Sequence, residues 1–92
     1  MNSRFTMAVH LLGMLTWAQR SGKGPLTSEC AAQSINTSPV VIRRLVGMLH
    51  AQGMVESKKG PNGGIQLARE PDKITLREVY EAVSDDTPIL GG

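Results

Sequence analysis

Two adjacent arginines, Arg43 and Arg44, have side chains suited to recognising a polyanion. A guanidinium group can donate two parallel hydrogen bonds to a guanine edge or to a phosphate. Lys58 and Lys59 form a second pair of cations, directly before a glycine-rich segment. These four residues predict contact with nucleic acid. An ordinary solvated surface is the alternative interpretation, since many charged pairs on helices do no more than face water.

The charge of the chain is unevenly distributed, although its net value is only +2. Residues 38–69 carry five basic side chains and one acidic, whereas residues 70–92 carry two basic and six acidic. A basic middle section beside an acidic end favours one face that binds a polyanion, and a chance arrangement of surface charge is the alternative. The three aromatic residues are too few for the stacking platforms on which single-strand binding relies.

Several functional classes are excluded by composition. Ninety-two residues suit one domain with a modest aliphatic core. The chain contains no apolar run of membrane-spanning length and no basic leader followed by a cleavage site, so we expect a cytoplasmic protein with no membrane association. It also lacks a nucleophile–base pair, metal-ligand spacing and a cofactor fingerprint, which predicts a protein that is not an enzyme and needs no cofactor.

A helix-turn-helix is expected to position the two arginines. Thr27 can cap a short first helix, Asn36 suits a left-handed turn, and Ser38 followed by Pro39 is a start signal for a second helix. Apolar residues then recur at i, i+3, i+4 and i+7, which predicts one buried face made of Ile42, Leu45, Val46 and Leu49. The arginines fall outside that face, and Gly53 is the expected C-cap.

A β-hairpin is expected directly after the second helix. Residues 54–58 and 65–67 alternate weakly between apolar and polar, and residues 60–64 form a concentrated turn signal. Lys58 and Lys59 flank the tip, where basic side chains can reach phosphate or the minor groove. A hairpin in this position is the wing of a winged helix-turn-helix, so the predicted fold is mainly α with a small β-hairpin, over residues 1–84.

Two further helices are expected to complete the core. Ser3 can cap a helix over residues 4–20 whose apolar residues lie on more than one face, so neighbours should wrap it on several sides, a partner subunit among them. Gly13 is unfavourable in a helix interior, and a close helix crossing would explain it. Near the other end, Thr75 and Glu78 form a capping box. The apolar stripe expected to close the core after it is Leu76, Val79, Tyr80 and Val83.

These motifs resemble the Rrf-two family of bacterial winged-helix transcription regulators over about residues 3–83. The most specific part is the wing, KGPNGGIQLA at residues 59–68, followed by ITL at 74–76 and VYEAV at 79–83. The resemblance implies a repressor that binds double-stranded DNA as a homodimer, with recognition helix 38–52 in the major groove and wing 58–65 at the minor groove. The predicted DNA-binding residues are Thr27, Ser38, Val40, Arg43, Arg44, Lys58, Lys59 and Asn62.

The chain departs from the family pattern in two respects. Cluster-binding members carry three cysteines after the fourth helix, whereas this chain has none there, so the resemblance is to a subgroup without an iron–sulfur cluster. Members also continue into a long C-terminal helix that builds most of the dimer interface, whereas this chain stops at Gly92. We therefore expect residues 85–92 to be a tail or the truncated start of a dimerisation region, unless the dimer forms otherwise, for example through the first helix.

Two further questions stay open at the level of the sequence. Cys30, in the first turn of the short helix that Thr27 caps, is interpreted as a small residue that packs the domain, and a redox-sensitive thiol is the alternative. A winged helix that binds a protein partner in place of DNA is the alternative function. The sequence identifies no small-molecule effector.

Overall fold

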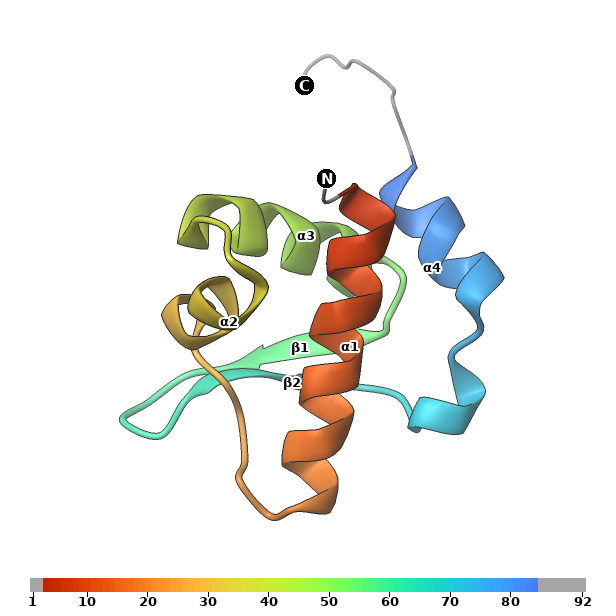
Figure 1. Cartoon of the computed structure of the whole chain (residues 1–92). Coiled ribbons are helices and arrows are strands. Elements are labelled where there is room, and N and C mark those ends of the chain that lie inside the picture. The colour runs from red at the N-terminus through yellow and green to blue at the C-terminus, as the bar shows by residue number, and fades with distance from the viewer. Residues whose placement is uncertain (1–2, 85–92) are drawn as a thin grey trace.

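Residues 3–84, the part that the computed structural model describes, form four α-helices and a two-stranded antiparallel hairpin (Figure 1). The elements are α1 (Arg4–Arg20), α2 (Ser28–Ile35), α3 (Pro39–Ala51), β1 (Val55–Lys58), β2 (Gly64–Leu67), the 3-10 turn η1 (Pro71–Lys73) and α4 (Leu76–Val83). The predicted fold class is confirmed. The predicted tail at residues 85–92 lies outside the described residues.

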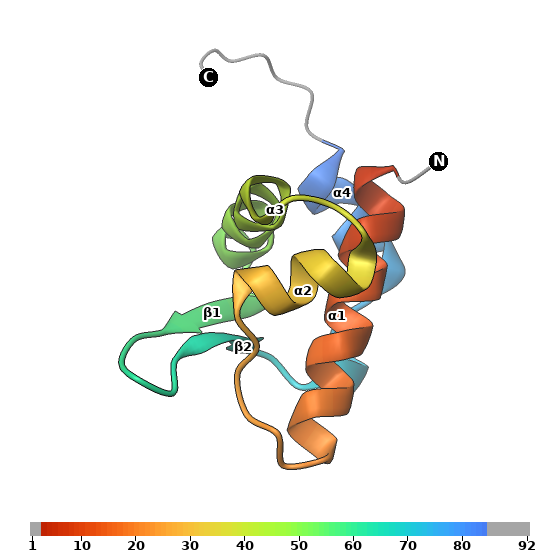
Figure 2. The same ribbon diagram turned by 60° about the vertical axis from the view of Figure 1, so that its left-hand side comes forward.

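Helix α1 lies between the other helices, with α2 on one side of it and α4 on the other (Figures 1 and 2). It begins as predicted, because the Ser3 hydroxyl oxygen accepts a hydrogen bond from the Thr6 N–H. Its buried residues form one broad face: Met7, Ala8, Leu11, Leu12, Leu15 and Ala18. His10, Gly13 and Trp17 on the opposite face are exposed, so the described neighbours cover one wide face of the helix and not the several sides that were predicted. Within residues 3–84 a Cβ at Gly13 would meet nothing within 4 Å, so no close crossing in this part of the chain explains the glycine.

Local capping defines the two helices of the helix-turn-helix. Thr27 Oγ1 accepts from the Cys30 N–H at 3.0 Å, and Ser38 Oγ accepts from the Val41 N–H at 3.3 Å. Between the helices Asn36 adopts the left-handed conformation (φ 66°, ψ 53°), as predicted. The predicted C-cap is displaced by one residue: Gln52 caps α3, and Gly53 follows with φ 74°.

The hairpin is anchored on the loop that precedes α2. Its strands pair from Val55 opposite Leu67 to Lys58 opposite Gly64, close to the predicted limits. Leu26 extends the hairpin by an isolated bridge, since its N–H donates to the Ile65 carbonyl at 2.9 Å and the Ile65 N–H donates back at 2.6 Å. A Cβ at Gly64 would lie 2.5 Å from the Leu26 carbonyl oxygen, so this close approach requires glycine.

Helix α4 closes the core with only half of its predicted stripe. Val79 and Val83 are buried, but Leu76 is 64% exposed and Tyr80 is 57% exposed. The expectation for these two residues is wrong because α4 packs on α1 and α3 through the side that carries the valines. The Tyr80 ring instead packs edge-on against Phe5 near the start of α1, with ring centroids 5.7 Å apart.

Candidate nucleic-acid interface

The exposed side of α3 carries the residues predicted to read DNA. The four residues of the predicted apolar face are buried, whereas Val40, Arg43 and Arg44 are exposed. Helix α3 and the tip of the hairpin lie on the same side of α1 (Figures 1 and 2). The fold thus brings both predicted groups of cations to one side of the molecule.

Arg43 forms an ion pair with Glu29, in the first turn of α2. The sequence predicted the position of Glu29 at the helix start, but not this contact. Arg43 Nη2 donates to Glu29 Oε2 at 3.2 Å, and the two side chains are 58% and 68% exposed. An ion pair this exposed stabilises a fold by at most about 1 kcal/mol. Arg44 makes no ion pair within residues 3–84. The two adjacent arginines are therefore not equivalent.

Three smaller predicted residues lie at the starts of α2 and α3. Thr27 and Ser38 are exposed at the starts of α2 and α3, where their oxygens accept the capping hydrogen bonds. A hydroxyl that accepts one hydrogen bond keeps its own O–H to donate, so both caps can still contact a phosphate. Val40 is 63% exposed and offers methyl groups of the kind that contact thymine.

The hairpin tip is exposed and basic. Lys58 ends β1, and Lys59 and Asn62 lie in the turn that follows, all three exposed. Among the described residues neither lysine forms an ion pair. The acidic residue on the same hairpin, Glu56, accepts a hydrogen bond from Gln66 Nε2 at 2.6 Å across the strands. The tip therefore projects two cations that no described carboxylate neutralises.

Comparison with known proteins finds helix-turn-helix transcriptional regulators. The family model for Rrf2, described as an iron-dependent transcriptional regulator, matches residues 1–91. The chain belongs to the Rrf2 family. This family consists of transcriptional regulators and not of enzymes. The resemblance read from the wing motif is confirmed.

Individual relatives agree with the family assignment. Over 82 residues the chain is 37% identical to YwnA of Bacillus subtilis. The aligned region covers 89% of this chain and 57% of YwnA. The chain is 36% identical over 70 residues to the HTH-type transcriptional regulator CymR of the same organism, covering 76% of this chain and 51% of CymR. The chain thus spans little more than half the length of these Rrf2 relatives.

Solved structures of Rrf2 regulators share the fold. The structure of CymR (YrzC), the global cysteine regulator of B. subtilis, matches with a TM-score of 0.79 at 28% identity, covering 89% of this chain and 62% of that one. The T. potens IscR structure matches with a TM-score of 0.78 at 26% identity, covering 90% and 59%. The helices and the wing are therefore arranged as in regulators of this family.

Arg69 is a residue of the Rrf2 fold that sequence reasoning counted only as one more basic charge. Its Nη2 donates to the Gln52 carbonyl at 2.7 Å, and its Nη1 donates to Glu78 Oε1 at 2.9 Å and to the Lys73 carbonyl at 3.2 Å. It therefore ties the end of α3 to the start of α4. Nothing in the spacing of residues 52, 69 and 78 indicates this contact before the chain is folded.

The predicted capping box at the start of α4 is present. The Thr75 N–H donates to Glu78 Oε1 at 3.1 Å, and the Glu78 N–H donates to Thr75 Oγ1 at 3.1 Å. The hydrogen bond from the Thr75 N–H, and after it the one from Arg69, lower the pKa of Glu78 from its ordinary value. Glu78 is therefore stabilised in its ionised carboxylate form, which accepts the hydrogen bond from Arg69.

Cys30 does not pack the domain as predicted. It is exposed on α2, because the inward positions of that helix are taken by Ala31 and Ala32, which are buried. It lines an apolar groove of about 450 Å³ between α1 and α2, together with Met14 and Trp17. Within residues 3–84, no three histidine, cysteine or acidic side chains lie close enough to hold a metal ion. The redox alternative for Cys30 stays a prediction.

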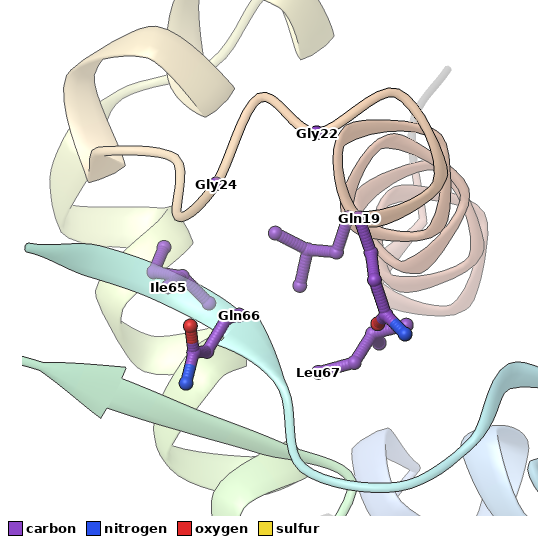
Figure 3. A pocket seen from close by; sticks show the side chains of 7 residues that line it. Gln19, Gly22, Gly24, Ile65, Gln66 and Leu67 are labelled. Carbon is purple, nitrogen blue, oxygen red and sulfur yellow. The ribbon is translucent and has the colours of Figure 1, made fainter.

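A separate pocket of about 370 Å³ lies between the end of α1, the loop after it and β2 (Figure 3). Gln19 and Gln66 supply its polar side chains, and Ile65 and Leu67 form part of its apolar wall. An amide does not ionise near neutral pH, so this lining contributes no acid or base.

None of the helices in the described part of the chain is long and apolar enough to span a membrane.

Proposed function

We propose that residues 1–84 are the DNA-binding domain of an Rrf2-family transcriptional repressor that acts in the cytoplasm on double-stranded DNA. The observation that carries this proposal is the shared exposure of the first half of α3 and the basic wing tip on one side of α1. A positively charged helix and hairpin that project from one side of a protein fit the grooves of a DNA duplex better than a flat protein surface would.

In this proposal α3 enters the major groove. Val40, Arg43 and Arg44 lie on its exposed side, and the N-terminal half of a recognition helix is the part that reaches base edges. Ser38 and Thr27 sit at helix starts, where hydroxyl and N–H groups suit contacts with phosphate. These contacts fix the register of the domain on DNA, and the side chains of α3 read the sequence.

The wing is proposed to follow the adjacent minor groove. Lys58, Lys59 and Asn62 are exposed at its tip, and a narrow minor groove has an enhanced negative potential that attracts cations. Neither lysine has to give up an ion pair with residues 3–84 before it binds phosphate. The wing therefore adds affinity that depends on DNA charge and shape more than on base identity.

We further propose that the full-length regulator is a homodimer on a partly palindromic operator. Leu76 and Tyr80, one helical turn apart on α4, are both more than half exposed, which supports an apolar contact with a second copy. A two-fold dimer places its recognition helices in successive major grooves, roughly 34 Å apart. The operator is then expected to contain two half-sites about one helical turn apart.

The test is a selection of duplexes from a random-sequence library by the 92-residue chain, followed by fluorescence anisotropy. The selected duplex should bind more tightly than a scrambled duplex of equal composition, and log affinity should fall with log salt with a slope of several units. Equal affinity for both duplexes, with little dependence on salt, would overturn the proposal and favour a winged helix that binds protein. Arg43→Ala should weaken binding to the selected duplex by about 10-fold.

A further inference from the structure

One carboxylate, that of Glu29 on α2, lies beside the arginines of α3. Glu29 accepts a hydrogen bond from Arg43 Nη2 at 3.2 Å, although 14 positions separate the two residues in the chain. An acidic residue in the first turn of a helix is ordinarily explained by the helix dipole. Here it also contacts one of the two arginines proposed to reach DNA, and a negative charge at that place opposes the approach of phosphate.

The contact holds Arg43 without exhausting its hydrogen-bonding capacity. A guanidinium carries five N–H donors, and Glu29 receives one hydrogen bond from them. No other hydrogen bond to Arg43 is found among the described residues, so further donors remain for a bidentate pair with a guanine edge. Because a long side chain loses rotamer freedom on binding, an arginine already oriented by its neighbour binds with a smaller entropic loss.

The geometry points to Glu29 as a positioning residue that makes Arg43 selective for a base edge over phosphate. This inference rests on the proposed DNA-binding function. The Glu29 carboxylate orients the Arg43 guanidinium and repels a phosphate that comes near it. Arg44, which has no ion pair within residues 3–84, is left to bind the phosphate backbone. Glu29 thus raises sequence discrimination and lowers affinity for DNA of any sequence.

The packing of α2 on α3 makes this contact possible. Ala31 and Ala32 are buried and small, so the two helices approach closely, and the left-handed Asn36 reverses the chain between them. The first turn of α2 is thereby brought beside the exposed side of α3. A change at Glu29 therefore acts on the reading side of α3 without touching its buried face.

The experiment compares Glu29→Gln with a matched control, Glu81→Gln. Glu81 accepts from Arg77 Nε at 3.3 Å in another exposed ion pair on α4, which lies on the opposite side of α1 from α2. Each variant removes one negative charge and one surface ion pair. Anisotropy titrations measure the affinity of each 92-residue chain for the selected duplex and for the scrambled duplex across a salt series.

Glu29→Gln is expected to tighten binding to the scrambled duplex and to lower the ratio of selected to scrambled affinity by about three- to fivefold. A repeated selection with this variant should show relaxed preference at the base pair that Arg43 reads, which is a change that a merely structural role would not produce. Glu81→Gln should leave the ratio unchanged, because its charge is screened over about 8 Å at physiological salt.

The outcomes separate this inference from the function on which it rests. Equal effects of Glu29→Gln and Glu81→Gln would mean that only net charge matters, and would overturn the positioning role. That role would also be overturned, with DNA binding left intact, if Glu29→Gln did not change the ratio of selected to scrambled affinity while Arg43→Ala weakened binding to the selected duplex. A chain that binds no duplex specifically would overturn the proposed function itself. Thermal unfolding of each variant identifies loss of fold, which lowers affinity for both duplexes alike.

Discussion

Arg69 Nη2 lies 2.7 Å from the carbonyl oxygen of Gln52, the residue that caps α3. The last carbonyl groups of a helix lack partners within the helix and carry its negative dipole end, so a guanidinium at this place satisfies and stabilises them. The same side chain reaches Glu78 at the start of α4. One arginine after the wing therefore links the end of the proposed recognition helix to the element that closes the core.

Arg69→Ala is expected to destabilise the domain by about 1–2 kcal/mol, because charge-assisted hydrogen bonds at a partly buried site are lost together. For a domain of this size the unfolding midpoint should fall by roughly 5–15 °C. Arg77→Ala is the control, since Arg77 makes one exposed pair with Glu81 and its loss should cost under about 1 kcal/mol. Equal shifts for the two variants in thermal melts would contradict the role assigned to Arg69.

The stability of the domain should depend on pH through Glu78. Its pKa in the folded chain is lowered, first by the Thr75 N–H and then by Arg69, from an ordinary value of 4.5. A group whose pKa is lowered by folding binds fewer protons in the native state, so its contribution is complete above the ordinary pKa and is lost as pH falls through the lowered one. Unfolding midpoints measured from neutral pH downward should show this loss, and Glu78→Gln should show less of it. Parallel curves for both chains would contradict the prediction.

Gly13→Ala should stabilise the domain by up to about 1 kcal/mol, because alanine is the better residue in a helix interior. A Cβ at this position meets nothing within 4 Å in the described chain, so no clash offsets the gain. Gly64→Ala is the opposite case, since its Cβ would lie 2.5 Å from the Leu26 carbonyl oxygen and the bridge that anchors the hairpin would break. Chemical denaturation of both variants tests the pair, and destabilisation by Gly13→Ala would indicate an unrecognised contact there.

Replacing both wing lysines, Lys58→Gln with Lys59→Gln, should weaken binding to selected and scrambled duplexes alike. Each phosphate contact that is lost should reduce the salt slope by about one, so the double variant should lower it by up to about two. Lys73→Gln is the control, since Lys73 is exposed on η1 and away from the wing. A double variant with an unaltered salt slope would show that the wing makes no phosphate contact.

Arg44→Ala should lower affinity for every duplex by a similar factor, whereas Arg43→Ala should act mainly on the selected duplex. The difference follows from the ion pair that holds Arg43 and from the absence of such a pair for Arg44 among residues 3–84. The measurement is the ratio of the two affinities for each variant. A lower ratio for Arg44→Ala than for Arg43→Ala would reverse the two assignments.

Local chemistry alone was sufficient to predict the helix starts, the turn and the wing. Ser3, Thr27, Ser38 and Thr75 cap the four helices as expected, because a cap depends on residues within one turn of it. Asn36 takes the left-handed conformation for a reason equally local. The wing motif also carried the family resemblance, because a tight turn restricts which residues can occupy it.

Contacts between residues far apart in the chain were decided only by the tertiary structure. The pairing of Arg43 with Glu29 depends on the angle between α2 and α3, and the bridge from Leu26 to Ile65 depends on where the loop after α1 meets the hairpin. The exposure of Leu76 and Tyr80 follows from the side by which α4 packs on α1 and α3. Helical periodicity identifies an apolar stripe, but the neighbouring elements determine how much of that stripe is buried. The sequence by itself therefore determined the elements and the cationic residues on them, and the packing of those elements determined that Arg43, and not Arg44, is held by a carboxylate.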